Sequence, residues 1–459
     1  MTLSDADLDG IRQTFAGELI RAEDTGYDDA RAIFNSMIDK RPALIAQCAG
    51  VEDVRAAVEL ARTSGLPTAV RGGGHSVAGK SLCDDGIVID LRRMNSVSID
   101  PEARTATVGG GATMSDLDRG TEPHGLATTG GRVSTTGVGG FTLGGGAGWL
   151  DRKLGLACDR MLSVELVTAD GRVVTASEDD NQELFWALHG GGGNFGIATS
   201  FKFRLDPVPV VTAALLVWAP EAGREVMRRY RDFLETAPDE VGGGLIYLTG
   251  PEEEFVPEGL VNKLACAVLV TYAGEESEAR EVMRPILDLK PAGQMIESMP
   301  YAELQCMLDD PPGYRNYWSA EYLDDFPDEA VDLFCARATD MIVPSPSQHV
   351  LFPQGGAVGR GDGDIPISWK GASWVVHPFG LWEDPDDDER ARQWAKDIRA
   401  DLQRWATGAA YHNFMGDEGQ DRLVAGFGRE NYDRLARVKA EYDPDNLFRL
   451  NPNVEPARA

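Results

Sequence analysis

The sequence predicts an α+β protein made of two parts that differ in character. In residues 1–206, short strand patterns bounded by Gly, Asp or Asn mix irregularly with helix patterns, unlike the regular alternation of a doubly wound sheet. Four of the five glycine clusters also lie before residue 200. After a proline-containing turn at 206–209, longer strand and helix patterns indicate an antiparallel sheet with helices on one face.

The elements of the first part follow from apolar periodicity and turn residues. Residues 51–61 carry apolar side chains at helical spacing, and Gly65 follows the expected end of this helix. The Asp-Gly pair at 170–171 predicts a hairpin between 162–169 and 172–176. The other elements expected here are strands at 66–70, 87–91, 96–99, 105–108 and 197–205 and a helix at 181–189.

The second part carries longer segments. Strands are expected at 212–218, 244–248, 264–272, 349–352 and 373–379. Helices are expected at 222–235, 276–287, 329–341 and 386–406. Basic residues do not cluster between 206 and 410, which argues against a polyanionic substrate. Four tryptophans here could line an aromatic pocket, stack on sugars or fill the core, namely Trp318, Trp369, Trp374 and Trp382.

Composition narrows the classes of partner. The 459 residues carry a formal net charge of −30, which repels nucleic acid and anionic membranes and leaves a small molecule as the expected partner. The N-terminus lacks a signal-peptide pattern, and no apolar run approaches the ~20 residues of a membrane span, so the cytoplasm is the expected location. Six cysteines without a CxxC pair predict buried thiols rather than a disulfide frame or a metal site: Cys48, Cys83, Cys158, Cys266, Cys306 and Cys335.

The most informative motif is the run at 71–79, in which three glycines directly precede His75. Glycine reaches positive φ and admits close approach of another molecule to the backbone. Successive backbone N–H groups can also form a concavity that binds anions. The run therefore predicts a phosphate-bearing cofactor beside an imidazole, while a glycine-rich turn with a surface histidine is an equally good reading of this segment alone.

Two further glycine blocks lie at 130–150 and 189–197. The first has nine glycines in 21 residues, interleaved with Ser and Thr, which suits a backbone wrapped around a flat polar ligand. A glycine-rich packing loop is the alternative. Neither block is a GxGxxG that opens a helix after a strand, so a Rossmann dinucleotide site is excluded.

Together these blocks resemble the FAD-linked oxidases of the berberine-bridge-enzyme-like branch of the vanillyl-alcohol oxidase superfamily. Most of the N-terminal half and the tail match in the order and spacing of this family, whereas residues 206–410 match loosely. The segments that carry the resemblance are 41–45, 71–79, 89–91, 137–149, 155–159, 167–171, 184–188, 190–197 and 431–453.

The resemblance implies that FAD is bound covalently through His75 to its 8α-methyl group. Many relatives have a second link through a cysteine, but Val133 occupies that position, and Cys158 lies too far along the chain to replace it. A single covalent link is therefore expected. The cofactor-binding residues implied are Arg71, Gly72, Gly73, Gly74, His75, Ser76, Gly79, Ser134, Thr135, Thr136, Gly137, Gly139, Gly140, Gly145, Gly148, Trp149, Gly196, Ile197, Asn451 and Asn453.

Four residues are candidates for the chemistry. Tyr411 matches a family tyrosine that lies at the reactive face of the flavin, where it either acts as a base or orients the substrate. Thr136 falls where the family controls access of dioxygen, or else merely lines the cavity. Tyr247 and His377 lie on alternating strands, where a core position is the commoner explanation.

The expected function is oxidation of a C–H bond next to a hydroxyl or amine, with hydride transfer to flavin N5 and reoxidation by dioxygen to hydrogen peroxide. Two alternatives remain open, a flavin dehydrogenase with another acceptor and a flavin-carrying binding protein without turnover. The expected arrangement is an FAD-binding domain of 1–206 and 411–459 with a substrate domain of 207–410, in a monomer or small homo-oligomer. The substrate itself is not readable from the sequence.

Overall fold

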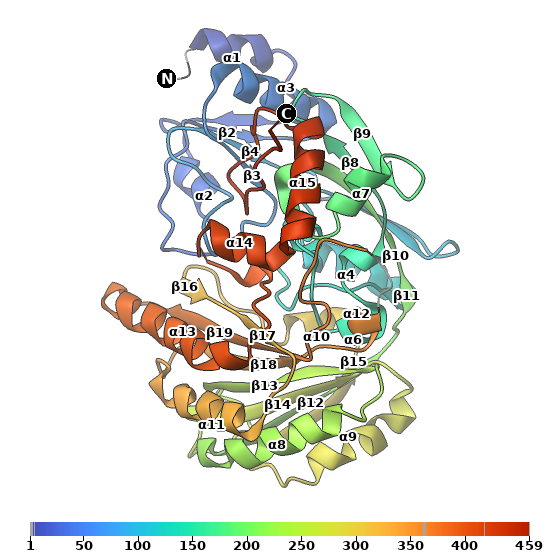
Figure 1. Ribbon diagram of the computed structural model, residues 1–459, viewed down its shortest axis with the longest axis vertical. Coiled ribbons are helices and arrows are strands. Elements are labelled where there is room, and N and C mark those ends of the chain that lie inside the picture. The colour runs from blue at the N-terminus through green and yellow to red at the C-terminus, as the bar shows by residue number, and fades with distance from the viewer. Residues whose placement is uncertain (1–2, 4, 361–363, 417, 459) are drawn as a thin grey trace.

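The computed structural model describes residues 3, 5–360, 364–416 and 418–458. These residues form two lobes stacked along the long axis (Figure 1). The upper lobe in this view contains the N-terminal strands and the C-terminal helices, and the lower lobe contains the middle of the chain. The α+β class is thus confirmed.

The first sheet of the upper lobe has the strand order β1-β2-β4-β3. Strands β2, β4 and β3 are parallel, and β4 is buried along its whole length, as its Ile-Val-Ile sequence requires for a strand covered on both faces. The helix predicted at 51–61 is α3, and it ends at Gly65 in the left-handed conformation (φ 65°). The elements of this region are α1 (Asp5–Arg12), β1 (Glu18–Ile20), α2 (Tyr27–Arg31), β2 (Leu44–Gln47), α3 (Val51–Ser64), β3 (Thr68–Arg71) and β4 (Ile87–Asp90).

The second sheet of the upper lobe is antiparallel, with the order β5-β6-β10-β8-β9. Its β8–β9 pair is the predicted hairpin, and Gly171 in the turn adopts φ 80°. The strands are β5 (Val97–Asp100), β6 (Thr105–Gly109), β8 (Met161–Val167), β9 (Val173–Ser177) and β10 (Ile197–Arg204), with the short pair β7 (Leu126–Ala127) and β11 (Asp206–Pro207) beside it. The helices are α4 (Met114–Thr121), α5 (Val138–Leu143), α6 (Asp151–Leu154) and α7 (Gln182–Ala187).

The lower lobe is built on an eight-stranded antiparallel sheet in which β17 pairs with β19 beside the path β15-β12-β14-β13-β18-β19-β16. Residues of β12 alternate between two cores: Leu216 packs against helices, whereas Leu215 faces the upper lobe. The strands are β12 (Val211–Trp218), β13 (Val241–Thr249), β14 (Leu264–Tyr272), β15 (Gly293–Met299), β16 (Arg315–Trp318), β17 (Glu321–Leu323), β18 (Gln348–Pro353) and β19 (Trp374–Trp382).

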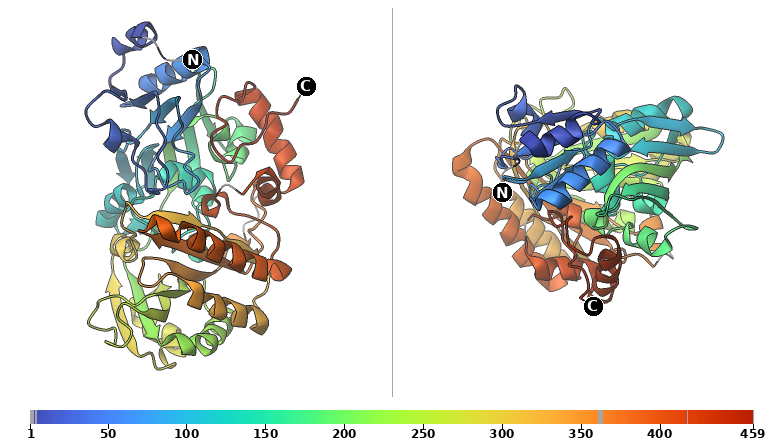
Figure 2. Two further views of the ribbon diagram at one scale, coloured as in Figure 1. Left: turned by 90° about the vertical axis from the view of Figure 1, so that its left-hand side faces the viewer. Right: turned by 90° about the horizontal axis from the view of Figure 1, so that it is seen from above.

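Helices cover the outer face of this sheet, as predicted, while the upper lobe covers the other face (Figures 1 and 2). Both faces are therefore apolar, which explains why these strands show long apolar runs instead of polar alternation. The helices of the lobe are α8 (Gly223–Leu234), α9 (Ala279–Leu287), α10 (Tyr301–Cys306), α11 (Asp328–Arg337), α12 (Ala357–Arg360) and α13 (Asp388–Leu402).

After α13 the chain returns to the upper lobe as α14 (Gln420–Phe427), α15 (Arg429–Tyr442) and an extended tail. Buried Lys439 of α15 fixes this return, because its ammonium group donates to the carboxylate of Asp443 (2.6 Å) and to the carbonyl oxygens of Asn194 (2.7 Å) and Phe448 (3.0 Å). A buried ammonium with three acceptors keeps its charge compensated. The tail is thereby tied to the third glycine block.

The cysteines and the surface bear on the expected partners. Five cysteines are buried free thiols as predicted, but Cys306 is exposed because it ends the short helix α10 at the surface.

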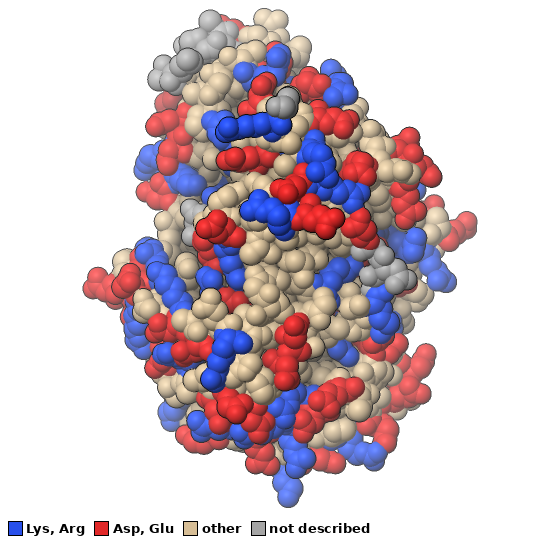
Figure 3. Space-filling view, in the orientation of Figure 1, with Lys and Arg blue, Asp and Glu red and all other residues tan. Residues whose placement is uncertain are grey.

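Acidic and basic side chains are interspersed over the face shown in Figure 3. In the described part of the chain, no group of three or more His, Cys, Asp or Glu could hold a metal ion, and no helix has the length and hydropathy of a membrane span.

Candidate active site

A cavity of about 520 Å³ lies between the lobes. Its walls come from three places: the glycine blocks of the upper lobe, the inner face of the lower sheet, and the segments 411–416, 418–420 and 448–453. The two kinds of wall differ in chemistry. The glycine wall exposes backbone, whereas the sheet wall exposes side chains, mainly Ile246, Gln348, Val350, Phe352, His377 and Phe379.

His75 lines the cavity at the end of the first glycine run. Its Nε2 is 2.8 Å from the hydroxyl of Thr135, and its ring stacks on Phe34 with a centroid distance of 4.2 Å. Burial lowers the pKa of His75 to about 4, so the imidazole is neutral near pH 7. Because Thr135 occupies Nε2, Nδ1 is the ring nitrogen without a hydrogen bond among the described residues.

Arg71 does not line the cavity, contrary to its predicted cofactor contact. Its guanidinium is buried behind the glycines and donates to the carbonyl oxygens of Ala30 (2.5 Å) and Ala32 (2.6 Å) at the end of α2. Gly79 also lies off the cavity, with φ 65° in a turn against Ile38. Both residues support the loop from behind, and the sequence could not separate this role from contact with a ligand.

The glycines of the wall serve two different needs. Gly73 and Gly137 touch through their backbones: a Cβ on Gly73 would lie 2.3 Å from the Gly137 nitrogen, so neither position tolerates a side chain. Gly140 and Gly193 line the cavity, and a Cβ there would meet no atom within 4 Å. The first pair joins two loops, and the second pair keeps room for a ligand.

Most of the predicted cofactor-binding residues lie on the cavity. Those that line it are Gly72, Gly73, Gly74, His75, Ser76, Thr136, Gly137, Gly139, Gly140, Trp149, Gly196, Ile197, Asn451 and Asn453. Those that do not are Arg71, Gly79, Ser134, Thr135, Gly145 and Gly148. Ser134 instead donates to Asp309, and Gly148 packs against the carbonyl of Gly130. The sequence reading missed Gly191 and Gly192, which also line the cavity.

The tail closes one end of the cavity. Asn451 donates from its amide nitrogen to the carbonyl oxygens of Gly193 (3.2 Å) and Phe448 (2.9 Å). The side-chain oxygens of Asn451 and Asn453 are buried and have no hydrogen-bond partner among the described residues. Unpaired buried acceptors are unusual in a folded protein, so they indicate that a polar ligand completes this end.

Tyr411 is buried in the cavity wall, and its hydroxyl is already engaged. The oxygen accepts hydrogen bonds from the backbone nitrogens of Gly146 (3.0 Å) and Ala147 (3.2 Å) and from the amide of Asn413 (2.9 Å). Burial raises the pKa of Tyr411 to about 12. The phenol is therefore protonated near neutral pH, and its oxygen holds the Gly146–Ala147 turn; its role as a base or in orienting the substrate stays a prediction.

Tyr247, the weaker of the two tyrosine candidates, lies in the core on the outer face of the sheet, which is the commoner explanation given for it above. Its neighbour Ile246 lines the cavity, while Tyr247 packs among the outer helices. The Tyr247 hydroxyl donates to the carbonyl of Pro220 at 3.3 Å. Strand alternation sends adjacent residues to opposite faces, and which face lies inward cannot be read from this strand because both of its faces are apolar.

His377 of β19 lines the sheet wall. Its Nδ1 lies 2.7 Å from the carbonyl oxygen of Ser319, and a carbonyl only accepts, so Nδ1 carries the proton and Nε2 keeps its lone pair. The ring stacks on Phe414 with a centroid distance of 4.1 Å and an interplanar angle of 11°. Burial lowers the pKa of His377 to about 4, so it is a neutral acceptor near pH 7.

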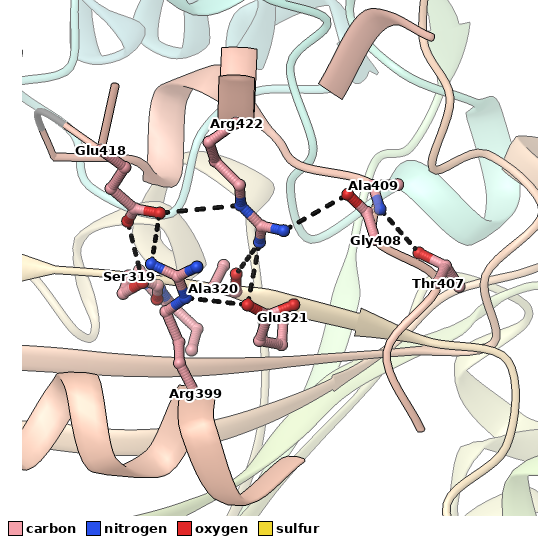
Figure 4. A network of polar contacts seen from close by, with 10 residues as sticks. Ser319, Ala320, Glu321, Arg399, Thr407, Gly408, Ala409, Glu418 and Arg422 are labelled. Carbon is pink, nitrogen blue, oxygen red and sulfur yellow. Dashed lines mark hydrogen bonds and ion pairs between the residues drawn. The ribbon is translucent and has the colours of Figure 1, made fainter. Parts of the chain in front are cut away.

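A buried ionic network holds the segment next to this histidine (Figure 4). Glu418, which lines the cavity, accepts from the Ser319 hydroxyl (3.0 Å) and from Arg399 (2.6 Å). Glu321 accepts from Arg399 (2.8 Å) and Arg422 (3.0 Å). Both carboxylates are at most 5% exposed, so the two guanidinium groups are needed to compensate them. The network joins β17, α13 and α14 and fixes the backbone at Ser319.

Of the four tryptophans that could line an aromatic pocket, one does so, while the phenylalanines of the site were not predicted. Trp318 lines the cavity and packs on Phe379 at a centroid distance of 4.5 Å. The other three tryptophans are buried core residues that do not line it: Trp369, Trp374 and Trp382. Phe352 and Phe379 carry no motif; their positions on the inward face are set by strand register alone. Phe414 comes from the short turn that follows Tyr411. Thr136 and Val133 line the cavity, and no cysteine does among the described residues.

Comparison with known proteins agrees with this arrangement. Residues 42–177 match the family model described as FAD binding domain, and residues 410–455 match the model described as Berberine and berberine like. The (R)-6-hydroxynicotine oxidase of Paenarthrobacter nicotinovorans is 30% identical over 460 residues, covering 96% of this chain and 97% of the relative. An uncharacterized FAD-linked oxidoreductase of Bacillus subtilis is 28% identical over 452 residues, covering 96% and 97%.

Solved structures give the same result. The crystal structure of 6-hydroxy-D-nicotine oxidase from Arthrobacter nicotinovorans superposes with a TM-score of 0.86 at 28% identity, covering 97% of this chain and 99% of that one. The xylooligosaccharide oxidase of Myceliophthora thermophila has the same fold, with a TM-score of 0.85 at 24% identity and coverage of 99% and 100%. The chain therefore belongs to the berberine-bridge-enzyme-like family of FAD-linked oxidoreductases.

Proposed function

We propose that this oxidoreductase is an oxidase that removes a hydride from a C–H bond next to a hydroxyl or amine of a small organic substrate. Dioxygen is the proposed electron acceptor and hydrogen peroxide the product. The observation that carries this proposal is the placement of the neutral, acceptor His377 across the same cavity from the glycine wall. One wall suits a cofactor and the other offers a base for the substrate proton.

The glycine wall fits FAD. Open space at Gly140 and Gly193 leaves room for a flat group, and the unpaired oxygens of Asn451 and Asn453 need polar partners. Backbone N–H groups of the Gly72–Gly74 run would hold the phosphates. Bound flavin would supply the redox chemistry by accepting the hydride at its N5 position.

His75 is the proposed point of covalent attachment. Its neutral imidazole is the nucleophilic form, Thr135 engages Nε2, and Phe34 holds the ring plane. Nδ1 is then the nitrogen available for the link. Val133 and the cysteine-free lining of the described cavity support a single link.

His377 is the proposed base. The Ser319 carbonyl fixes the proton on Nδ1 and stabilises the positive charge that develops when Nε2 accepts a second proton. A base with a pKa of about 4 cannot ionise a free alcohol, so Nε2 takes the hydroxyl or amine proton as the hydride leaves carbon. Thr136, at the cavity wall, is proposed to influence access of dioxygen.

Reduction of the flavin by substrate and its reoxidation by dioxygen can be measured separately. A candidate substrate should bleach the flavin without air, and air should restore the colour with one peroxide per turnover. Bleaching that air does not reverse would identify a dehydrogenase that uses another acceptor. Failure of every alcohol and amine to bleach the flavin would identify a binding protein. The division into 1–206 with 411–459 and 207–410 is likewise a proposal, testable by limited proteolysis near 207 and 411.

A further inference from the structure

We propose that Asp310 is the base that removes a proton from the 8α-methyl group of FAD while His75 forms its covalent link, so that the chain attaches its own cofactor. This inference rests on the proposed attachment at His75 and goes beyond it, because it names the residue that drives the bond-forming step. It is carried by the strap 307–314, which leads from α10 to β16 and is tied at both ends to the segments that contact His75.

The first end of the strap is fixed to the loop that carries Thr135. The Asp309 carboxylate accepts from the backbone nitrogen (2.7 Å) and from the hydroxyl of Ser134. The hydroxyl of the next residue, Thr135, lies 2.8 Å from Nε2 of His75. The carbonyl oxygen of Ser134 accepts in turn from the backbone nitrogen of Ser115 in α4 (2.8 Å). The strap and the imidazole therefore contact two adjacent residues of one fixed loop.

The second end of the strap is fixed to the segment that carries Phe34. The backbone nitrogen of Ser36 donates to the carbonyl oxygen of Tyr314 at 3.1 Å. The ring of Phe34 stacks on His75 with a centroid distance of 4.2 Å. Asp310 directly follows the first anchor residue, about 3.8 Å away along the chain, and lines the same cavity as His75. Both anchors thus hold the carboxylate of Asp310 on the side of the cavity where the link forms.

This carboxylate is the one in the cavity wall that no other group compensates. Two carboxylates line the cavity in the described part of the chain, Asp310 and Glu418. Glu418 accepts from Arg399 (2.6 Å) and from the Ser319 hydroxyl (3.0 Å), whereas no hydrogen bond or ion pair with a described residue engages Asp310. Burial, together with the like charge of Asp309, raises the pKa of Asp310 to about 7. A base with a pKa near the working pH is well suited to proton transfer.

Other titratable groups of the cavity fit this role less well. Burial lowers the pKa values of His377 and His412 to about 4, so both are weaker bases than Asp310. Burial raises the pKa of Tyr411 to about 12, and its oxygen already accepts three hydrogen bonds. The carboxylate of the strap therefore combines basicity, access to the cavity and a fixed relation to His75.

The step balances with dioxygen as its co-reactant. Asp310 takes one proton from the methyl group, and the electron pair of that C–H bond passes into the flavin ring. Nδ1 of His75 forms the new C–N bond with its lone pair, and the imidazole gives up its N–H proton. The attached flavin has then gained two electrons and the equivalent of the two protons released. Dioxygen takes both electrons and both protons, which yields one hydrogen peroxide for each flavin attached.

The test follows attachment instead of turnover. The full chain, produced in riboflavin-starved cells, is mixed with FAD in air and quenched with acid at intervals, and the flavin that precipitates with the chain is measured. Asp310→Asn should bind FAD as the parent does but gain covalent flavin at least about 100-fold more slowly, the lower end of the contribution of a general base. Asp310→Glu keeps a carboxylate and should stay within about tenfold of the parent. Glu303→Gln, exposed on α10 before the strap, is the control and should match the parent.

The outcomes separate this inference from the proposed function. Equal rates of attachment in the parent and Asp310→Asn overturn the role of Asp310 and leave His75 as the attachment site. A parent that gains no covalent flavin overturns the attachment at His75 as well. Failure of every alcohol and amine to bleach the attached flavin contradicts the oxidase and leaves the role of Asp310 standing.

Two further measurements keep the inference open to refutation. If Asp310→Asn fails to fold, Asp310→Ala replaces it with acetate added as a substitute carboxylate; attachment that speeds up with acetate supports the inference, and attachment that ignores acetate overturns it. Without air and without substrate, the parent should bleach FAD in step with attachment, and air should restore the colour with one peroxide per flavin. Attachment that leaves the flavin oxidised in the absence of air would overturn the proposed step.

Discussion

The two walls of the cavity differ in how the sequence encodes them. The glycine wall is formed by three contiguous segments of the sequence, 71–79, 130–150 and 189–197. In these segments the backbone conformation and the close approach of other atoms to the backbone dictate the residue type. The sheet wall is assembled from single residues on separate strands, such as Ile246, Phe352 and His377. The first wall can be recognised in a linear sequence, and the second exists only after strand register is set.

This difference suggests a division of labour. The glycine wall accommodates a large ligand mainly through its backbone. The chemistry of the sheet wall depends on side chains, so a single substitution can change it. Variants of each wall should therefore fail in different ways.

The largest loss of rate is expected for a substitution in the sheet wall. His377→Asn should lower the rate of flavin reduction by roughly 10²–10⁴-fold, the usual contribution of a positioned base, with FAD content unchanged. His124→Asn, on an exposed turn of the upper lobe, is the matched control. Single-turnover reduction without air gives the rate, and a variant that reduces at the parental rate would remove His377 from the mechanism.

The pH dependence of the flavin reduction rate also tests the role of His377. Burial lowers the pKa of His377 to about 4, and its neutral form is the active one, so the rate should stay constant as pH falls through the ordinary histidine pKa of about 6.5 and drop as pH approaches about 4. The limb should be absent in His377→Asn. An acid limb centred near pH ~6.5 would show that the imidazole titrates as if exposed.

The ionic network behind the sheet wall should have the next largest effect. Arg399→Met leaves Glu418 and Glu321 with a single guanidinium, and the free energy of unfolding should fall by about 3 kcal/mol. Arg390→Met, on the same helix but 57% exposed, should change it by less than about 0.5 kcal/mol. Denaturant titration of both variants decides the matter: equal midpoints would mean that the network contributes nothing to stability.

A substitution at the contact between the two glycine loops should lower the FAD content rather than the rate of flavin reduction. Gly137→Ala brings a Cβ to within 2.2 Å of the Gly73 nitrogen, which should push the two loops apart, cost about 1–3 kcal/mol and lower FAD content. Gly259→Ala, where a Cβ meets no atom within 4 Å, is the control. The ratio of flavin to protein absorbance measures loading, and full loading of Gly137→Ala would contradict the close loop contact.

The smallest effect is expected at Tyr411. Tyr411→Phe leaves the nitrogens of Gly146 and Ala147 without their acceptor, at a cost of about 1–3 kcal/mol in stability, and keeps a base at His377. The dependence of the reduction rate on pH should be unchanged. Loss of the rate by more than about a hundredfold, with FAD in place, would restore Tyr411 as the base.

The sequence predicted the glycine wall well and the sheet wall poorly, for physical reasons. Positions such as Gly140 and Asn451 belong to local motifs, so they could be placed on the cavity without knowing the fold. Arg71 and Ser134 belong to the same motifs yet face away, because a motif does not distinguish support from contact. For Tyr247 the sequence left a core position and a site role open, since both faces of its strand are apolar.

We propose that the glycine wall holds FAD through His75 while the sheet wall carries the chemistry. The most direct test is flavin fluorescence of the denatured chain on a gel, for the parent and for His75→Ala and His377→Asn. We expect a fluorescent band for the parent and for His377→Asn and none for His75→Ala. A dark parent band, or a fluorescent His75→Ala band, would contradict it.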